Sequence, residues 1–493
     1  MAYVVAALLS LVVLAGVAWA TRSYLHSYAR RAGRRTVMRA RVRIDRYKLR
    51  QKSYVIDVLL ADADIAEAVR TYVAETGASD ADAWRRVRRY LDEIVPFFNI
   101  LAYYRLGYWV SRAALGLFYK VSVEYERPDP FRTVPRNSVV IYLMNHRSNA
   151  DYVLVAYVMM GAVSISYAVG EWARAFPLEV LFKSFGSYFI RRRFREPLYH
   201  AVLQSYVQLI TRNSVTQGIF PEGGLTRDGA LRPAKIGLLD YALGVARDPE
   251  VRARMYVVPV GINYDRVIED RTLLRELETR QQVPTRDRIA QAADVGRFVL
   301  WNVGRLLTRR WRRYGRAAVT IGTPVSIDAW LTGLEARGVS LFDAPRTERL
   351  PEVQHFCDDV LQRIGAIIPV TPVPLACAAL QSFDADFVSR GALLERMSAM
   401  RDVLKEFNGR VLQADRNIEE TFERAYRMLR MRRVIARTGD GFLILPNGRP
   451  LITYYANSIV HLLGPFADGM RAREALPLHD WERDALVRSR DPG

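Results

Sequence analysis

Residues 138–151 read SVVIYLMNHRSNAD, an apolar run followed by a histidine and, five residues later, an aspartate. The apolar part has the length and the β-branched content of a buried strand. Inside one helix a five-residue gap would set the two side chains about 140° apart. They can meet if His146 lies in the loop after the strand and Asp151 in the first turn of a helix. The stretch therefore predicts a strand–loop–helix unit.

Further strand-like runs alternate with helical ones between about residues 121 and 345, which predicts an α/β domain. Besides 138–144, these runs are 121–125, 165–169, 218–220, 255–259 and 318–321. The pattern divides the chain into residues 1–21, a basic and helical region 22–120, the α/β domain 121–345, and a mostly helical region 346–493. Within the last region, turn signals on either side of residues 442–445 favour a small hairpin.

The N-terminal residues 2–20 are almost all apolar, enough to cross a hydrocarbon core about 30 Å thick as a helix. Arginines follow this run from Arg22 onward, and none precedes it. By the positive-inside rule, this asymmetry predicts a membrane anchor with the rest of the chain in the cytoplasm. A cleaved signal peptide and a helix lying in the membrane interface are the alternatives.

The chain of 493 residues has a formal charge of +20, from 72 Lys and Arg against 52 Asp and Glu. Such a surface attracts polyanions, which include nucleic acid, anionic lipid and phosphorylated substrates. The two cysteines, Cys357 and Cys377, form neither a disulfide framework nor a zinc-ligand spacing. We expect no metal site.

His146 and Asp151 have the residue types of a general base and its orienting partner. A neutral imidazole can remove a proton from an alcohol, and a carboxylate can hold its other ring nitrogen. The alternative is structural: Ser148 and Asp151 have the spacing of a helix cap, and His146 would then be an incidental loop residue.

Three other stretches carry features of a site for a phosphate ester. Residues 220–229, FPEGGLTRDG, place glycines where backbone N–H groups can approach a phosphate, with Thr226, Arg227 and the nearby Lys235 as further donors. Residues 186–194, GSYFIRRRF, supply arginine forks, and residues 257–265, VVPVGINYD, could line an acyl chain. The structural alternatives are a plain turn, a solvated basic edge and a central buried strand.

Taken in their order along the chain, the four stretches resemble the four sequence blocks of the glycerolipid acyltransferases. The detail is most similar to the membrane-bound glycerol-3-phosphate 1-O-acyltransferases, a branch that includes the dihydroxyacetone-phosphate acyltransferases. The matching segments are His146 to Asp151, Gly186 to Phe194, Glu222 to Gly224, and Val258 to Val260. One position departs: after Glu-Gly-Gly the branch usually has Arg-Ser-Arg, whereas this chain has Leu225-Thr226-Arg227.

The resemblance implies a central mixed sheet flanked by helices and a transfer of fatty acyl groups to the sn-1 hydroxyl of glycerol 3-phosphate. It implies no cofactor beyond the co-substrate, acyl-CoA or acyl carrier protein, and a lysophosphatidic acid that leaves into an anionic membrane. His146 would be the base and Asp151 its orienting partner. The implied phosphate-binding residues are Arg191, Arg192, Glu222, Gly223, Gly224, Thr226, Arg227 and Lys235, and the implied acyl-binding residues are Val258, Pro259 and Val260.

Two alternatives remain open on the sequence. The acceptor could be dihydroxyacetone phosphate or lysophosphatidic acid. A basic membrane-associated scaffold is the alternative without catalysis, and no nucleic-acid partner is expected because no nucleic-acid-binding module is recognisable.

Overall fold

The computed structural model describes residues 47, 50–97, 108–132, 134–135, 137–159, 163–170, 182–191, 194–279, 313–412 and 416–467. All of them belong to one compact unit that begins at Arg43. The expected membrane anchor, residues 1–21, lies outside the described residues. Among the helices that are described, none is both long and apolar enough to cross a membrane.

An eight-stranded mixed sheet forms the centre of the structure, with the strand order β1-β7-β6-β2-β5-β3-β4 and β8 paired to β6. Its strands are β1 (Lys120–Tyr125), β2 (Val139–Met144), β3 (Ser166–Val169), β4 (Tyr188–Phe189), β5 (Gln217–Ile219), β6 (Met255–Tyr264), β7 (Arg316–Ile321) and β8 (Val325–Ser326). All six strands expected from the sequence are present. The expected mixed sheet is confirmed, because β2 pairs in parallel with β5 and β6 whereas β6 and β7 are antiparallel.

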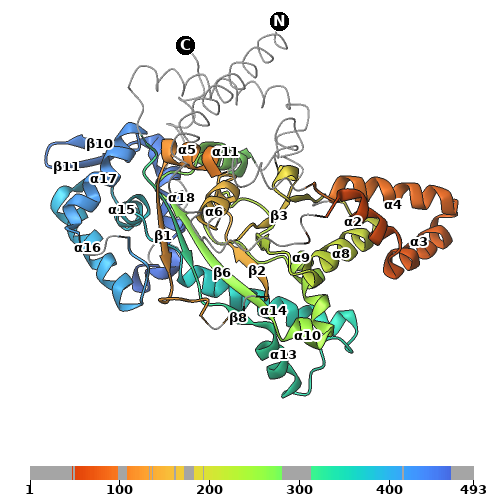
Figure 1. Cartoon of the computed structure of the whole chain (residues 1–493). Coiled ribbons are helices and arrows are strands. Elements are labelled where there is room, and N and C mark those ends of the chain that lie inside the picture. Colours follow the sequence, from red (N-terminus) through yellow and green to blue (C-terminus); the bar gives the residue numbers. More distant parts are fainter. Residues whose placement is uncertain are drawn as a thin grey trace, which may run out of the picture. The chain divides into compact units, whose positions relative to one another are not determined.

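The sequence missed β4 and β8, which have two residues each, and the second half of β6. Two residues are too few for a recognisable period. Strand β6 runs to Tyr264 because it gains a second partner: residues 260–264 pair with β7 after residues 255–260 have paired with β2. Strands β2 and β6 lie side by side (Figure 1). The extension carries β6 four residues beyond Val260, the partner of the last residue of β2, to Tyr264.

Both faces of β2 are buried, as expected for a central strand of a sheet covered by helices. Val139, Ile141 and Leu143 pack in one hydrophobic cluster, and the alternate residues Val140, Tyr142 and Met144 pack in another. The first cluster includes α2 (Lys52–Leu60), α3 (Ala63–Thr76), α4 (Asp80–Ile94), α8 (Pro197–Arg212), α9 (Gly237–Leu243), η4 (Gly244–Arg247), α10 (Pro249–Arg252), α13 (Ile327–Glu335) and α14 (Arg346–Ala366).

The second cluster joins the other face of the sheet to the C-terminal region. It includes α5 (Tyr108–Phe118), α6 (Asp151–Met159), α11 (Asp270–Thr279), α15 (Pro372–Gln381), α16 (Arg390–Glu406), α17 (Ile418–Met431) and α18 (Arg449–Asn457). Helix α15 is the centre of the C-terminal region, since Pro372 to Leu380 are all buried.

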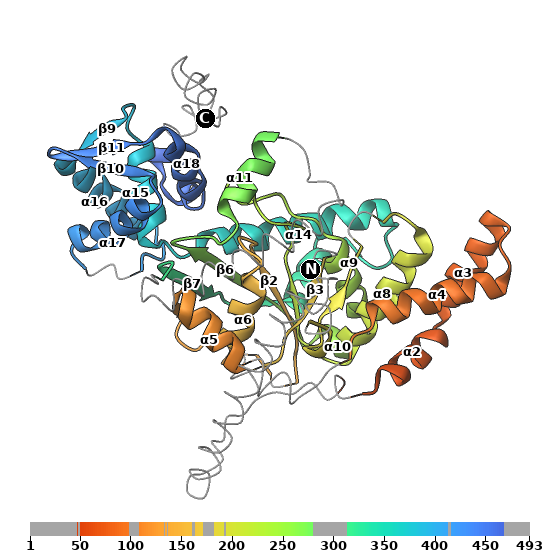
Figure 2. The ribbon, with the colours of Figure 1, turned by 90° about the horizontal axis from the view of Figure 1, so that it is seen from above.

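The C-terminal region is mostly helical, with a small antiparallel sheet in the order β10-β11-β9 beside α15 to α18 (Figure 2). The strands are β9 (Phe387–Ser389), β10 (Ile435–Thr438) and β11 (Gly441–Ile444), and the short 3₁₀ helices are η6 (Pro446–Gly448) and η7 (Val460–Leu462). The expected hairpin is present as β10 and β11, and Gly439 supplies its positive φ of 58°.

Candidate active site

His146 lies in the loop between β2 and α6, and α6 begins at Asp151. Its Nδ1 is 3.0 Å from Asp151 Oδ2, and both side chains are buried. With Nδ1 donating to the carboxylate, the nitrogen that can accept a proton is Nε2. The strand–loop–helix unit expected from the five-residue gap is therefore the arrangement that brings the two side chains together.

Asp151 is held by donors on both carboxylate oxygens. Besides His146, its Oδ2 accepts from the backbone N–H groups of Arg147 at 2.7 Å and Ser148 at 3.0 Å. Its Oδ1 accepts from the Tyr264 hydroxyl at 2.5 Å. The hydrogen bond from Ser148 N to Asp151 is one of the two that the expected helix cap would form. The Ser148 hydroxyl instead accepts from Ala150 N and donates to Glu269.

The loop after β5 is joined to the backbone of His146 at two points. Glu222 Oε1 accepts from His146 N at 2.7 Å, and Thr226 N donates to His146 O at 3.2 Å. The other oxygen of Glu222 accepts from Arg232 N at 3.0 Å. Burial raises the pKa of Glu222 to about 7, although the N–H groups of His146 and Arg232 act to lower it. Glu222 thus fixes one loop against the other.

Aromatic side chains set the plane of the His146 ring. Phe220 stacks on it with centroids 4.0 Å apart, and Tyr152 meets it edge-on at 5.4 Å. The preceding residue, Asn145, donates to Ile262 O and accepts from Ile262 N, which ties the base of the loop to β6. The orientation of the imidazole is therefore determined by packing as well as by Asp151.

A third loop, between β6 and α11, supports the same segment through Glu269. Its carboxylate accepts from the Ser148 hydroxyl at 2.7 Å and from Asn149 N at 3.2 Å. Burial raises the pKa of Glu269, and the Ser148 hydrogen bond acts to lower it. The next residue, Asp270, forms a buried ion pair with Arg432 of the C-terminal region.

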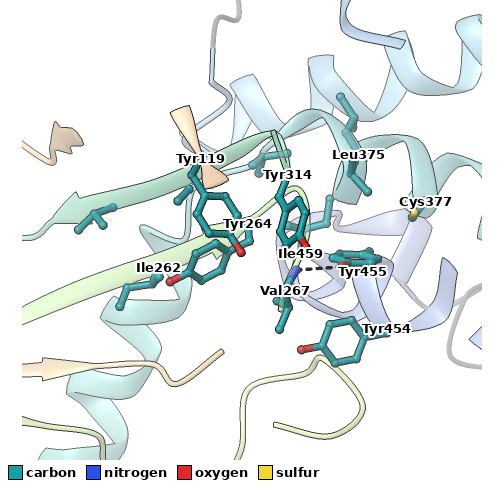
Figure 3. Close-up of a cluster of buried hydrophobic side chains, with 14 of the residues drawn as sticks. Tyr119, Ile262, Tyr264, Val267, Tyr314, Leu375, Cys377, Tyr454, Tyr455 and Ile459 are labelled. Atoms are coloured by element: carbon teal, nitrogen blue, oxygen red, sulfur yellow. Dashed lines mark hydrogen bonds between the residues drawn. The ribbon is translucent and has the colours of Figure 1, made fainter. Parts of the chain in front are cut away.

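Helix α18 of the C-terminal region contacts this third loop directly. The Tyr455 hydroxyl donates to Asp270 and accepts from Val267 N at 3.0 Å (Figure 3). In the same view Tyr264 lies against Tyr119, with ring centroids 5.3 Å apart. The C-terminal region thus holds the loop that carries Glu269, and Glu269 holds the segment after His146.

Arg147 is a buried arginine next to the histidine, only 3% exposed. Its guanidinium donates to Gly229 O and lies 5.4 Å from the centre of the Tyr454 ring. Its Nε and one terminal nitrogen have no hydrogen-bond partner among the residues that the structure describes. A Cβ at Gly229 would lie 1.9 Å from Tyr454 O, so this contact between α18 and the site requires glycine.

The predicted phosphate-binding arginines differ in their partners. Arg191 lies just after β4, at the far end of the strand order from β1, and its fork is bidentate to Glu93 at 2.9 and 2.6 Å. Arg227 directly follows Thr226, which is bonded to His146. Among the residues that the structure describes, only its Nε is paired, with Glu276 at 3.1 Å. Arg192 lies outside the described residues.

The other predicted residues of the anion loop lie together. Gly223 has a φ of +66°, and a Cβ there would lie 2.8 Å from the side chain of Lys235, which is exposed. The Thr226 hydroxyl bonds Asp228 and Gly229, which closes the turn. Gly224 is half-buried in the same loop.

Val258, Pro259 and Val260 are buried within β6. They pair with Tyr142 to Met144 of β2. The structure therefore gives them the structural role that the sequence left open, and an acyl-binding role stays a prediction.

A cavity of about 700 Å³ lies beside the loop 228–233, but it is lined by residues such as Arg232, Gln362 and His461 and not by His146. Within the described ranges, no cluster of His, Cys, Asp and Glu could hold a metal ion.

Sequence reasoning did not assign roles to Tyr264, Glu269 or Arg147. Tyr264 and Glu269 are more than 110 residues from their partners in the His146 loop, so no local spacing connects them. Arg147 stands inside the quoted motif, yet only its burial distinguishes it from a surface arginine. The one available signal in the sequence was that a buried strand runs directly into the polar segment Asn263-Tyr264-Asp265.

Two family models match adjacent parts of the chain. Residues 123–263 match the acyltransferase family, and residues 300–467 match the glycerol-3-phosphate acyltransferase C-terminal region. The second match begins before β7, so the strands of the central sheet are divided between the two matched segments.

Curated relatives match across both segments. A glycerol-3-phosphate acyltransferase of Xylella fastidiosa strain 9a5c is 24% identical over 423 residues, which are 84% of this chain and 47% of the relative. The glycerol-3-phosphate acyltransferase of Aeromonas hydrophila subsp. hydrophila is 25% identical over 426 residues, 84% of this chain and 50% of the relative. The chain thus spans about half the length of these relatives.

Among solved structures, the 1-acyl-sn-glycerophosphate (LPA) acyltransferase PlsC from Thermotoga maritima matches with a TM-score of 0.31 and 18% sequence identity. The match covers 53% of this chain and 77% of that one.

Proposed function

We propose that this chain, which carries an acyltransferase domain followed by a glycerol-3-phosphate acyltransferase C-terminal region, acylates the sn-1 hydroxyl of glycerol 3-phosphate. The donor is a fatty acyl thioester of coenzyme A or acyl carrier protein, and the product is a lysophosphatidic acid. The observation that carries the proposal is the buried pair of His146 and Asp151, 3.0 Å apart, in a loop that three other segments hold in place.

In the proposed reaction, His146 Nε2 takes the proton of the sn-1 hydroxyl while its oxygen attacks the thioester carbonyl carbon. The C–S bond then breaks, and the thiolate takes the proton back from His146, so that ester and free thiol leave the site. Asp151 stabilises the imidazolium that forms in between and keeps Nε2 as the basic nitrogen. No acyl-enzyme and no further cofactor are needed. Both cysteines are buried, and burial raises their thiol pKa values.

The acceptor phosphate is assigned to the loop after β5. Arg227 follows a residue bonded to His146, and its two terminal nitrogens have no partner among the described residues. Gly223 and Gly224 allow close approach of a phosphate to the backbone. Arg147 adds positive charge beside His146. Arg191 would first have to leave Glu93, and β4 is three strand positions, about 14 Å, from β2. We therefore favour Arg227 over Arg191 as the main phosphate ligand.

The membrane is proposed as the place of the reaction. A formal charge of +20 favours anionic lipid surfaces, and a lysophosphatidic acid product belongs to the bilayer. Anchoring by residues 1–21, with the catalytic domain in the cytoplasm, is part of this proposal. It rests on the sequence alone.

The decisive experiment is acyl transfer from radiolabelled palmitoyl-CoA to glycerol 3-phosphate by purified protein, beside the His146→Ala and His146→Gln variants. We expect product from the wild type and a loss of about 10²–10⁴-fold or more in kcat for both variants. His355→Ala is the matched control, because His355 lies exposed on α14. Turnover by His146→Ala at the wild-type rate would exclude the proposed base.

The same assay separates the remaining acceptors and the alternative without catalysis. Dihydroxyacetone phosphate, lysophosphatidic acid and acyl carrier protein thioesters replace the substrates one at a time. Preference for another acceptor at an unchanged His146 dependence would correct the substrate and keep the chemistry. Absence of transfer in every combination would favour a membrane-associated scaffold.

A further inference from the structure

A second cavity of about 700 Å³, distinct from the one beside the loop 228–233, lies where β1 and β7 begin. Among the described residues, its charged lining consists of five cationic side chains and one carboxylate: Lys120, Arg313, Arg316, Arg424, Arg427 and Asp265. Residues from the sheet and from α17 of the C-terminal region thus face one hollow. We call it the basic cavity.

The single carboxylate of the basic cavity is engaged by main-chain groups. Asp265 accepts from Arg316 N at 2.7 Å and from Val373 N at 3.0 Å. A Cβ at Gly315, whose φ is +89°, would lie 2.5 Å from Asp265, so the loop before β7 is packed tightly against it. One negative charge therefore faces five positive ones.

Arg316 is the most buried of the five cations, with 6% of its surface exposed. One terminal nitrogen donates to Ser122 Oγ at 3.0 Å. The other is buried and has no partner among the described residues. Burial lowers the pKa of Arg316, and repulsion from Arg424 acts in the same direction. A buried N–H group without an acceptor is costly, and an anion in the cavity would supply one.

Lys120 and Arg313 are exposed at the cavity, and neither forms an ion pair with a described residue. Within the described part of the chain, Arg427 donates only through Nε, to Glu423 O. These cations thus retain donors for several oxygen atoms at once. Several donors around a hollow match the oxygens of a phosphate-bearing small molecule.

The basic cavity lies at the same end of the strands of the central sheet as the His146 loop. Strands β1 and β7 run opposite to β2 and β6, so Lys120 and Arg316 begin their strands beside the end of β6, which extends beyond the end of β2 toward the His146 loop. The register pairs Tyr264 with Ala317, and Tyr264 bonds Asp151. From β1 to β2 there are three strand spacings, about 14 Å. A ligand held in the cavity by phosphates would need an extended arm to reach His146.

We propose that the basic cavity binds the phosphates of the nucleotide part of coenzyme A, so that an acyl-CoA donor spans the sheet edge from this cavity to His146. The inference rests on the proposed function and deepens it by selecting the donor. Acyl-CoA joins a phosphorylated nucleotide to its thioester by a long flexible arm. Arg316 lines the hollow and only 6% of its surface is exposed, so a small phosphate suits this position better than a flat membrane or the acidic surface of a carrier protein.

The direct test uses adenosine 3′,5′-bisphosphate, a fragment of coenzyme A, as the titrant in calorimetry with the full chain in detergent. We expect binding that weakens as salt rises, and that weakens about five- to tenfold or more in the Lys120→Ala/Arg313→Ala double variant. The matched control is Lys405→Ala/Arg437→Ala, which removes the same charge from exposed residues outside the cavity. Absence of binding, or equal weakening in both double variants, would overturn the proposal.

A kinetic test asks which donor depends on the cavity. We expect the Lys120→Ala/Arg313→Ala variant to raise KM about five- to tenfold for palmitoyl-CoA. It should leave KM unchanged for palmitoyl-pantetheine, which lacks the nucleotide, and for glycerol 3-phosphate. A KM raised only for the acyl carrier protein thioester would reassign the cavity to an acidic protein. Loss of binding to phosphatidylglycerol vesicles without loss of nucleotide binding would reassign the two exposed cations to lipid.

The two proposals can fail separately. If the wild type binds the nucleotide but transfers no acyl group, the basic cavity stands and the proposed function falls. If it transfers acyl groups from palmitoyl-CoA without nucleotide binding, the reverse holds.

Discussion

The loop after β2 and the segment after β4 both carry an arginine within three residues of the end of a buried strand, yet the two arginines have different surroundings. The loop after β2 lies near the middle of the sheet, and the loops after β5 and β6 hold it through Glu222 and Glu269. The segment after β4 lies at one end of the strand order, where Arg191 pairs with Glu93 of α4 and lies near the rings of Tyr90 and Phe194.

The comparison shows that position in the strand order, more than local composition, separates a candidate site from a structural contact. Near the middle of a sheet, loops from neighbouring strands can converge on one side chain. At an edge, fewer loops are within reach, and a charged group is more readily satisfied by a single partner. Pairing with Glu93 raises the pKa of Arg191 and holds its fork in place.

The largest expected effect is at Asp151. In the Asp151→Asn variant, an amide NH₂ replaces one of two oxygens that both accept hydrogen bonds, so at least one of the four donors is left without an acceptor. We expect kcat to fall by about 10²–10⁴-fold and the free energy of unfolding by about 1–3 kcal/mol. Steady-state acyl transfer and urea unfolding measure the two. Asp359→Asn on α14 is the exposed control, and a kcat within twofold of the wild type would show that Asp151 only caps α6.

The next effect is a pH dependence at Glu222. The folded pKa of about 7 lies above the ordinary 4.5, so between these values the folded state binds more protons than the unfolded state. Stability therefore falls as pH rises from about 4.5 to about 7, by about 3 kcal/mol. Glu222→Gln lacks this loss. Urea unfolding of both proteins at pH 5, 6, 7 and 8 should show the difference growing in favour of the variant, and a constant difference would contradict the raised pKa.

The smallest effects compare two arginines in the same assay. Arg227→Ala should raise KM for glycerol 3-phosphate by about tenfold or more, because a charge-assisted contact to phosphate is lost. Arg191→Ala should leave this KM within twofold. It should instead lower the free energy of unfolding by about 1–3 kcal/mol, since the buried Glu93 loses its bidentate ion pair with Arg191. The opposite pattern would move the phosphate to the β4 end of the sheet.

Much of the sheet was accessible from the sequence, since the six runs with strand-like composition all form strands. Local periodicity failed where the structure depends on long-range pairing. β4 and β8 are too short to show a period, and the end of β6 is a strand because β7 lies beside it. Helix α14 begins at Arg346, just after the boundary expected at residue 345, and it contacts β2 and β6. Its residues Val353 and Phe356 belong to the same hydrophobic cluster as Ile141 and Val257 of the sheet.

The candidate site divides in the same way. His146, Asp151 and Glu222 were chosen from short spacings, because a base, its carboxylate and an anion loop each leave a local pattern. The five-residue gap between His146 and Asp151 also predicted where these two residues lie, because their side chains can meet only if a loop precedes the helix. By contrast, Tyr264 and Glu269 bond the loop from 113 and 121 residues away. Asp270, next to Glu269, is paired with Arg432, 162 residues away, so these roles have no local signature.

By itself, the sequence determined the class of fold, the order of the site segments and the chemistry they could carry, because these follow from local period, glycine content and side-chain type. Only the tertiary structure decided which arginine lies beside His146 and which is engaged elsewhere, that the C-terminal region holds the β6–α11 loop, and that five cations surround one hollow. The physical reason is that burial, charge compensation and strand order depend on contacts between residues far apart in the chain.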